Sequence, residues 1–424
     1  MMSKKTIVRY TFWSIKFVVA VIIAGVLLRG LLESIFLPDR TATDYSFIKK
    51  DLQTPGFTGY STSQVLREQP FQIVALSDMA VGLMNLDTVK RVPRAELLPL
   101  IEEVKRRALT PYVSTYGSLT PDTDFTTGGI DGLYLSHLNL IFGIDQYLHS
   151  SKTADPLHTA ITKTLHERSL SEPDFHVPSF RNGDKWPADQ SVTLLSLYVY
   201  DQANGTTYSK EPIEKWFSFM NEKMVDPETG LYKPSIASRW YMDIPRGTAQ
   251  SWMIFYMAQF APDQAQRVYS LYREHMWKEF LGIGGFREWP IGRGGRMNID
   301  SGPIVFDIGS AATALGLGPA RLLHDTTHIV MITRLFSLLG IPHYAPLIGK
   351  AILFSGETAT PWFTDTKAQG YDVVPQFPLF LYALYLLFTV VVCATILFFD
   401  MILSYGIKKI IRFFSRNRKK TEHF

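Results

Sequence analysis

The feature that most constrains the fold is a unit that recurs about every 57 residues through the middle of the chain. Each unit reads as a polar surface helix, a short aromatic–Gly–Pro stretch, a loop with Arg or Asp, and an apolar helix rich in small residues. The apolar helices are predicted to begin near Asp131, Asp189, Gly247 and Pro303, at steps of 58, 58 and 56 residues. A fixed period of this length is typical of repeated helical units that share a core. The sequence therefore predicts one large repetitive helical domain.

Two kinds of helix alternate within these units. One kind is amphipathic and is predicted at Arg94–Leu109, Pro156–Ser169, Pro212–Met224, Pro262–Leu281 and Pro319–Leu339. The other kind has few charges and is predicted at Phe71–Leu86, Asp131–Leu148, Ala188–Ala203, Gly247–Phe260 and Pro303–Leu317. Helices that are apolar nearly all round belong in the middle of a structure. We therefore expect a ring of helical hairpins, with an inner barrel and an outer sheath. Five hairpins are countable, and a sixth would use Tyr344–Phe354.

Both ends of the chain carry apolar segments. Phe377–Phe399 is an uncharged run of 23 residues, long enough to cross a bilayer as a helix. Near the start, Phe17–Leu28 is apolar, and the pattern reaches Leu37 if Arg29 and Glu33 are tolerated as an i,i+4 pair. A cleaved signal peptide has a similar basic start and apolar core. An uncleaved anchor is favoured because no small-x-small cleavage site follows the core.

Basic residues flank both apolar segments on their terminal sides. They are Lys4, Lys5, Arg9 and Lys16 before the first segment, and Lys408, Lys409, Arg412, Arg416, Arg418, Lys419 and Lys420 after the second. Because basic residues next to a span stay in the cytoplasm, both termini are expected inside. The predicted parts are a cytoplasmic start and anchor over 1–37, an extracytoplasmic domain over 38–375, a transmembrane helix over 376–405, and a basic amphipathic tail over 406–424. The basic residues beside the two apolar segments account for the net charge of +4. The predicted outer domain has no stripe of basic residues interleaved with aromatic ones, so no nucleic-acid partner is predicted.

The one cysteine, Cys393, lies inside the second apolar segment. The predicted outer domain therefore contains no intramolecular disulfide, no cysteine nucleophile and no cysteine metal ligand. A large exported domain without disulfides suits a bacterial envelope, so we expect the protein in the cytoplasmic (inner) membrane of a bacterium.

The predicted ring resembles the (α/α)-toroid architecture, also called six-hairpin. The resemblance covers about residues 65–360 and rests on the period together with the loop style, as in Gly230-Leu231-Tyr232-Lys233-Pro234. This architecture occurs in glycoside hydrolases, polysaccharide lyases and uronyl epimerases, in terpenoid cyclases, and in enzymes of the linalool dehydratase-isomerase type. The resemblance implies an all-α domain of five or six hairpins whose long loops meet at one mouth. Because proteins with one fold catalyse many different reactions, the resemblance does not identify the reaction.

The long loops that enter the inner helices carry most of the domain's Trp and Arg, whereas the opposite connections are only a few residues long. This asymmetry predicts a site at the mouth of the ring. Aromatic rings with Arg and carboxylates suit sugars, and Arg also pairs with uronates. The predicted substrate-binding residues are Tyr134, Trp186, Arg239, Trp240, Tyr241, Arg246, Arg287, Glu288, Trp289 and Arg293.

Asp189 and Asp300 are the predicted catalytic carboxylates. Because Pro187 should take the first position of its helix, Asp189 should take the third. There it serves either as an acid/base group beside Trp186 or as an ordinary carboxylate at a helix start. Asp300 precedes an inner helix and either projects into the mouth or orders its loop.

Four further residues have both a functional and a structural interpretation. Asp131 and His137 would assist the catalytic pair, although Asp131 can cap its helix and a helical His is usually a core residue. Asp307, predicted one turn into the helix after Pro303, would be buried and would either act or pair with an Arg. Glu288 lies between Arg and Trp and can form a loop ion pair.

The sequence favours a membrane-anchored, carbohydrate-active enzyme of the cell envelope. Two carboxyl groups flanking a glycosidic bond suffice for hydrolysis, whereas elimination or C5 epimerisation would need a base such as His137 or Tyr134. One alternative is a lyase or isomerase acting on an isoprenoid or lipid alcohol. Another is a non-catalytic toroid that binds a glycan or a partner protein in a membrane complex. The expected partners are thus a glycan or other hydroxylated substrate and the lipid bilayer.

No metal and no cofactor is predicted. His324 and His328 have a ligand-like i,i+4 spacing, but they fall on a predicted outer helix and lack the Glu of a zincin.

Overall fold

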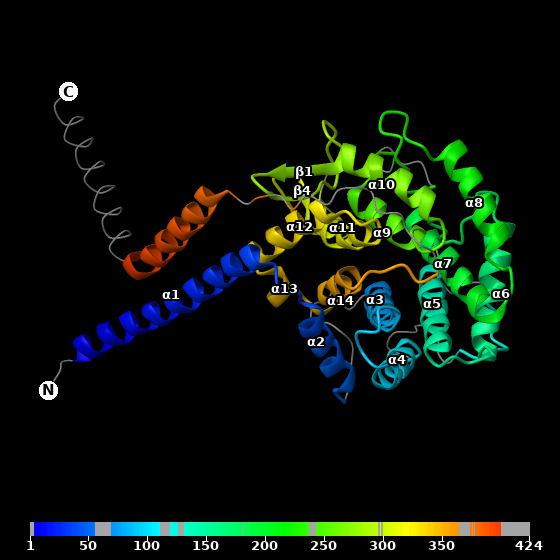
Figure 1. The fold of residues 1–424 in the computed structure, drawn as a ribbon, viewed down its shortest axis with the longest axis horizontal. Coiled ribbons are helices and arrows are strands. Elements are labelled where there is room, and N and C mark those ends of the chain that lie inside the picture. Colours follow the sequence, from blue (N-terminus) through cyan, green and yellow to red (C-terminus); the bar gives the residue numbers. More distant parts are fainter. Residues whose placement is uncertain are drawn as a thin grey trace, which may run out of the picture. The chain divides into compact units, whose positions relative to one another are not determined.

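The computed structural model of the protein is mostly helical, as predicted (Figure 1). The described residues are 4–55, 69–110, 119–125, 131–180, 182–236, 243–295, 297, 300–363, 374, 376 and 378–399. Their side chains are described from Thr11 onward, except at residues 69–71. The chain divides into two compact units. Unit 1 comprises Met1–Pro38, Thr333–His343 and Gln376–Phe424, and unit 2 comprises Asp39–Ile332 and Tyr344–Pro375.

Unit 1 contains two helices that are long and apolar enough to cross a membrane, Thr11–Phe36 within α1 (Lys4–Phe36) and Leu379–Phe399. The first of them contains three charged residues, Lys16, Arg29 and Glu33. Two of these are paired, because Arg29 Nε donates to Glu33 at 2.8 Å. His343 Nε2 also lies 2.9 Å from the Glu33 carboxylate. The expected i,i+4 pair is therefore confirmed. The predicted tail at 406–424 lies outside the described residues.

The helices of unit 2 alternate along the chain as the period predicts. They are α2 (Thr41–Gln53), α3 (Gln69–Thr88), α4 (Arg94–Ala108), α5 (Gly132–Leu148), α6 (Pro156–Ser171), α7 (Pro187–Asn204), α8 (Lys210–Lys223), α9 (Gly247–Met257), α10 (Pro262–Met276), α11 (Ser310–Leu322) and α14 (Leu347–Glu357). Two more, α12 (Thr326–Leu339) and α13 (Ile341–Tyr344), include residues of both units. Two antiparallel hairpins lie between α10 and α11, β1 (Trp277–Phe280) with β2 (Ile283–Phe286), and β3 (Ile304–Val305) with β4 (Ile308–Gly309).

Six apolar helices of unit 2 contact one another in a closed order. Helix α3 packs on α5, α5 on α7, α7 on α9, α9 on α11, α11 on α14, and α14 on α3. Burial agrees with this inner position, because every residue of α5 except Tyr147 is buried. The closing contact is tight: a Cβ added at Gly82 of α3 would lie 2.2 Å from Cε1 of Phe354 in α14. We call these helices the inner helices.

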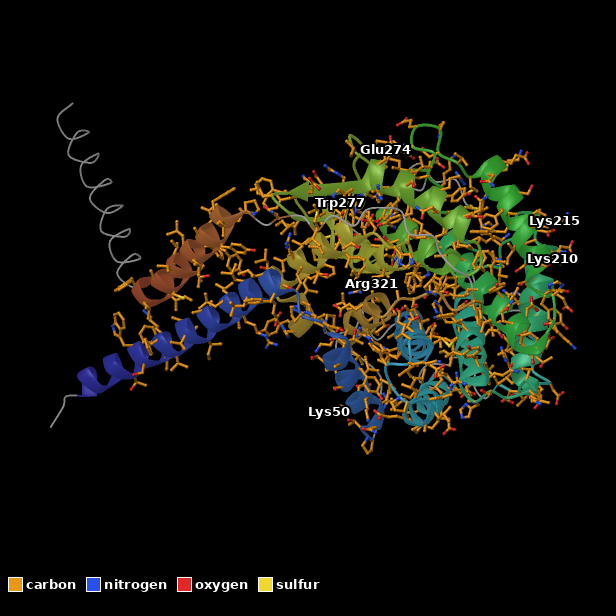
Figure 2. All side chains as sticks on the ribbon, in the orientation of Figure 1. Lys50, Lys210, Lys215, Glu274, Trp277 and Arg321 are labelled. Atoms are coloured by element: carbon orange, nitrogen blue, oxygen red, sulfur yellow. The ribbon has the colours of Figure 1, made fainter. Side chains whose placement is uncertain are left out.

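The remaining helices cover the inner ones with an amphipathic face. Helix α4 packs on α3 and α5, α6 on α5 and α7, and α10 on α9. In Figure 2 the labelled Lys210 and Lys215 of α8 and Glu274 of α10 point away from the inner helices, and all three are exposed. The outer faces are therefore polar, as amphipathic helices require.

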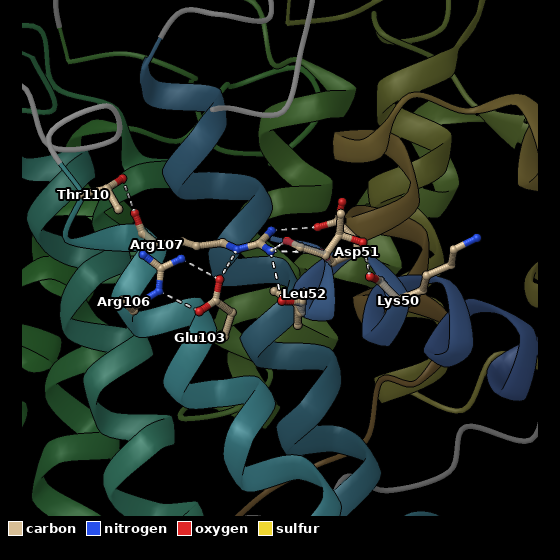
Figure 3. Close-up of polar contacts among 8 residues, drawn as sticks. Lys50, Asp51, Leu52, Glu103, Arg106, Arg107 and Thr110 are labelled. Carbon is tan, nitrogen blue, oxygen red and sulfur yellow. Dashed lines mark hydrogen bonds and ion pairs between the residues drawn. The ribbon is translucent and has the colours of Figure 1, made fainter. Parts of the chain in front are cut away.

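A buried arginine joins α4 to α2 (Figure 3). Arg107, 2% exposed, donates to the carboxylates of Asp51 at 2.9 Å and Glu103 at 2.7 Å. The same guanidinium donates to the carbonyl oxygens of Asp51 and Leu52 at the end of α2. Both carbonyls belong to the last turn of α2, where the Asp51 oxygen also accepts from Thr54 N at 3.0 Å. Arg107 therefore adds a cap contributed by a neighbouring element.

Short-range signals set the starts of several helices. Pro187 takes the first position of α7, and Gly205 ends that helix with φ +66°. At the starts of α5 and α9 a glycine allows close backbone approach. Gly132 N donates to Pro178 O and Gly247 N donates to Glu288 O, both at 2.9 Å. In both cases the acceptor lies in the loop of the following unit, so α5 and α9 begin where the next loop contacts them.

Three predicted helices were wrong in their bounds. The helix predicted at Pro262–Leu281 ends at Met276 and is followed by β1, and the one predicted at Pro319–Leu339 begins at Thr326, with Pro319 inside α11. The third is the helix predicted at Pro303–Leu317. The segment after Pro303 forms the β3–β4 hairpin, and α11 begins only at Ser310. Asp307 is consequently in the hairpin turn, with φ +64° and a side chain 64% exposed. Its carboxylate pairs with Lys278 at 2.8 Å and Arg287 at 2.9 Å. The burial expected for Asp307 was therefore wrong, while its pairing with an Arg is confirmed.

Candidate functional site

A cavity of ≈ 330 Å³ lies at the N-terminal ends of the inner helices of unit 2. Its walls come from all six of them and from the loops that precede them. The described residues that line it are Val74, Leu133, Phe180, Trp186, Ala188, Asp189, Pro234, Arg246, Thr248, Ala249, Trp252, Asp300, Ala311, Leu315, Ile348 and Ile352. Twelve of these are apolar or aromatic, so the few polar groups stand out against an apolar wall.

Asp189 and Asp300 both open into this cavity. Asp189 occupies the third position of α7, as predicted, and Trp186 immediately precedes the helix. Burial raises the pKa of Asp189 to about 7; the Ser179 hydroxyl opposes this shift and the charge of Asp300 adds to it. A carboxyl group with such a pKa is substantially protonated at neutral pH and can donate a proton.

Asp300 approaches the cavity from the loop before β3, with a side chain 48% exposed. Its Oδ2 lies 4.0 Å from Nη1 of Arg246. Arg246 also donates from Nε to Glu288 at 2.7 Å, and its guanidinium lies 5.6 Å from the ring centre of Trp289. The predicted site residues Arg246, Glu288 and Trp289 thus form one group next to Asp300.

Glu288 stabilises the start of α9 as well as Arg246. Its Oε2 accepts from the backbone N of Thr248 at 3.2 Å and from the Thr248 hydroxyl at 2.5 Å. Burial raises the pKa of Glu288, and the charge of Arg246 opposes that shift. The loop ion pair weighed for Glu288 is therefore present, and it holds Arg246 in place at the cavity.

A second, much smaller cavity of ≈ 10 Å³ lies deeper among the inner helices. It shares Trp252, Leu315 and Ile352 with the large cavity. Its other lining residues are Asp78, Phe255, Tyr256, Gly318, Ser355 and Gly356. Most of these lie about one turn further along the same helices, so the small cavity continues the large one away from its mouth.

Asp78 is the acidic group of the small cavity. It is 2% exposed, and its Oδ1 accepts from the Ser355 hydroxyl at 2.9 Å. Its Oδ2 has no hydrogen-bond partner among the described residues. Burial raises the pKa of Asp78 to about 7, against a smaller opposing effect of Ser355. Asp78 is therefore a second carboxyl group that holds its proton near neutral pH.

His137 is fully buried and packs edge-on against Trp252 and Tyr256, with ring centres 5.8 and 6.4 Å away. Neither ring nitrogen has a hydrogen-bond partner in the described part of the chain. Burial lowers the pKa of His137 to about 3, so its ring stays uncharged at neutral pH. Its position is that of a core histidine beside the cavities rather than of a residue lining them.

The other predicted site residues lie elsewhere. Asp131 precedes α5 without capping it, and the Tyr134 hydroxyl donates to Ala108 O at 2.9 Å, away from the cavity. Arg287 pairs with Asp307, and Arg293 pairs with Asp226 at 2.9 Å. These four are not among the described residues that line either cavity. Arg239, Trp240 and Tyr241 lie outside the described residues.

The cavity residues absent from the sequence-based set include Asp78, Trp252 and Tyr256. Asp78 had a usable signal, since it is the one charge between Ile73 and Leu86 in a helix expected to be buried. A carboxylate in that position needs a partner or a function. Trp252 and Tyr256 had no signal of this kind, because aromatic residues in a buried helix are ordinary core residues.

The ligand-like spacing of His324 and His328 does not produce a shared helical face. His324 precedes α12 with φ +56°, and His328 Nδ1 lies 2.8 Å from Asp325. Among the described residues no three His, Cys, Asp or Glu side chains gather as metal ligands would. No protein-family model matches the chain.

Proposed function

We propose that unit 2 is an acid/base enzyme in which Asp189 and Asp300 act on a substrate bound in the large cavity. The observation that carries this proposal is that both carboxyl groups line one cavity. General acid catalysis needs a group that is protonated near the operating pH, and the raised pKa of Asp189 meets that condition. Asp300 is the partially exposed carboxylate that accepts a proton in return.

The walls of the cavity favour a mostly apolar substrate with a hydroxyl group. A sugar carries many hydroxyls that need partners when buried, and among the described residues the polar lining consists of Asp189, Arg246, Thr248 and Asp300. An isoprenoid or lipid alcohol needs one such group and an apolar wall. The favoured reaction class is therefore a lyase or isomerase acting on such an alcohol.

The chemistry follows from the two carboxyl groups. Asp189 donates its proton to the substrate hydroxyl, the C–O bond breaks with its electrons remaining on oxygen, and water leaves. Asp300 then accepts a proton from the neighbouring carbon, and the electrons of that C–H bond form the double bond. Transfer of a proton from Asp300 back to Asp189 restores the starting state.

The closed contact order of the inner helices supports the proposal that unit 2 is an (α/α) toroid with six hairpins. The two apolar helices of unit 1, together with the basic residues outside them in the sequence, support a protein of the bacterial cytoplasmic membrane with both termini inside and unit 2 outside. In that arrangement a lipid alcohol would reach unit 2 from the membrane that anchors it.

The experiment uses the full chain in detergent micelles with geraniol, an allylic alcohol, as the probe. Binding is followed by quenching of Trp fluorescence, since Trp186 and Trp252 line the cavity, and products are identified by gas chromatography. We expect turnover that falls about 10²–10⁴-fold in Asp189→Asn. Thr193→Val, a buried change between α5 and α7 that lines neither cavity, is the matched control. Binding without any conversion, or conversion that survives Asp189→Asn, would overturn the proposal.

A carbohydrate substrate is the second candidate function. Trp186 beside Asp189 is the observation that favours it, because aromatic rings stack on sugar faces and a carboxyl pair can cleave a glycosidic bond. This candidate predicts that fluorogenic glycosides, and not geraniol, are turned over in a reaction that depends on Asp189.

A further inference from the structure

The small cavity has the size and the polar groups of a site for a single water molecule. Its volume of ≈ 10 Å³ is close to the minimum that one water needs. Among the described residues two buried polar atoms of its lining side chains have no partner: Oδ2 of Asp78, an acceptor when ionised, and Nε1 of Trp252, a donor. Leaving such atoms unpaired costs about 1–3 kcal/mol each, so native proteins usually provide a partner.

The orientation of Asp78 is fixed by its neighbour. Ser355 of α14 donates to Oδ1 of Asp78 at 2.9 Å, which leaves Oδ2 as the atom available to a ligand. A water molecule can donate to one group and accept from another, so it can bridge a carboxylate and an indole N–H.

The small cavity is linked to the reaction site. Trp252, Leu315 and Ile352 line both cavities. Burial, and then the charges of Asp78 and Asp189, raise the pKa of Tyr256 well above its usual value. The Tyr256 hydroxyl therefore lies within electrostatic reach of both carboxyl groups. Asp78 thus lies in the continuation of the cavity that Asp189 lines.

We propose that the small cavity binds one water molecule between Asp78 and Trp252, and that Asp78 exchanges a proton with this water during the reaction. This inference rests on the proposed function, because it assigns the water that a lyase releases or adds. In the addition direction the water oxygen forms a C–O bond with the cationic carbon of the substrate. One O–H bond of the water breaks, its electrons stay on oxygen, and the proton passes to the Asp78 carboxylate. Release of water from the substrate uses the proton of Asp189, and transfer of a proton from Asp78 back to Asp189 restores the starting state.

The first test is a crystal structure of the full chain at a resolution that shows ordered water. We expect one water within hydrogen-bond distance of Asp78 Oδ2 in the wild type and none in Asp78→Leu. Ser77→Ala, the neighbouring position of α3 that lines neither cavity, is the matched control and should keep the water. An empty small cavity in the wild type, or a water that remains in Asp78→Leu, overturns the water site.

The second test measures isotope incorporation from H₂¹⁸O into geraniol, and uses Asp78→Asn because that variant keeps the side-chain shape. We expect incorporation to fall about 10²-fold relative to hydrocarbon formation in Asp78→Asn. Asp189→Asn should lower both reactions together. If Asp189→Asn abolishes turnover while Asp78→Asn keeps full incorporation, the proposed function stands and this inference is overturned. If the water is present and incorporation depends on Asp78 but not on Asp189, the water site stands and the assignment of Asp189 is overturned.

Discussion

Arg246 Nε donates to Glu288 Oε1 at 2.7 Å, and the two side chains are 6% and 0% exposed. One end of this pair faces the large cavity and the other caps α9 through Thr248. The pair therefore links the loop that carries Glu288 to the helix that carries Trp252. A buried ion pair of this kind contributes little over an apolar pair, but loss of one partner leaves a buried charge without compensation.

Replacement of Arg246 by Met is expected to lower the free energy of unfolding by about 3–5 kcal/mol at pH 7. The loss should be smaller at pH 4, because without Arg246 the buried Glu288 is readily protonated and neutral. Denaturant unfolding of the full chain in detergent at the two pH values measures both effects. The double variant Arg246→Met/Glu288→Gln should recover part of the loss. Equal stability of Arg246→Met and wild type at pH 7 would contradict the buried pair.

The sequence predicted the part of this site that depends on local signals. Pro187 fixes the start of α7, so the third-position placement of Asp189 could be derived, and the period placed the entry loops at one end of the inner helices. The partner of each side chain could not be derived in this way. Tyr134 and Asp189 stand at similar places in successive units, yet Tyr134 turns outward to Ala108 O while Asp189 faces the cavity. The rotation of each helix about its own axis determines which side chain faces the cavity. That rotation depends on packing between helices rather than on local sequence.

The β3–β4 hairpin illustrates a different limit. Ile304, Val305 and Phe306 continue the apolar pattern of the helix that follows, so periodicity alone assigns them to it. The structure places Phe306 in a turn with φ +50° and 85% exposure. The bridge from Ile308 to Arg287 is a non-local contact, and together with the local pairing of β4 with β3 it outweighs helical propensity.

The buried state of His137 leads to a prediction about pH. Its pKa is lowered to about 3 in the folded protein from an ordinary 6.5, so the unfolded chain binds a proton that the folded chain does not. This contribution to stability is complete above pH 6.5 and is lost progressively as the pH falls toward 3. Between pH 7 and pH 5 the loss from this group is about 2 kcal/mol.

His137→Phe should therefore flatten the decrease in unfolding free energy between pH 7 and pH 5 by about that amount. Thermal or denaturant unfolding across this pH range provides the measurement. His149→Phe is the comparison variant, since His149 is partly exposed and bonded to Glu102, and its pKa is raised. An unchanged pH dependence in His137→Phe would show that the ring has a partner that compensates for its burial.

Closure of the inner helices can be tested at Gly82. A methyl group there would overlap the Phe354 ring of α14 at 2.2 Å, so Gly82→Ala should destabilise unit 2 by about 1–3 kcal/mol. Gly294→Ala is the matched control, because nothing lies within 4 Å of its added Cβ, and its effect should stay within about 0.5 kcal/mol. Adding Phe354→Leu to Gly82→Ala should restore part of the stability. If Gly82→Ala is as stable as the control, α14 does not pack on α3 as described.

The Arg107 contact between α2 and α4 has a comparable test. Arg107→Ala removes the donors to Asp51, Leu52 and Glu103 together and should cost about 3 kcal/mol. Arg106→Ala, at the neighbouring exposed position, should change the unfolding free energy by less than about 0.5 kcal/mol. Limited proteolysis adds a local readout, because α2 should become the first site of cleavage in Arg107→Ala. Unchanged protection of α2 would contradict its attachment through Arg107.

The pH dependence of turnover tests Asp189 directly. With the pKa of Asp189 at about 7, the fraction of enzyme that carries the acidic proton falls as the pH rises through 7. The rate of geraniol conversion should decline in the same range. Asp300→Asn removes a negative charge that raises this pKa, so the decline should move to lower pH even though the residual rate is smaller. Rates measured from pH 5 to pH 9 for both proteins decide the point. A decline that stays at the same pH in Asp300→Asn would mean that another group supplies the proton, and Asp78, with its pKa also near 7, would then be the residue to replace next.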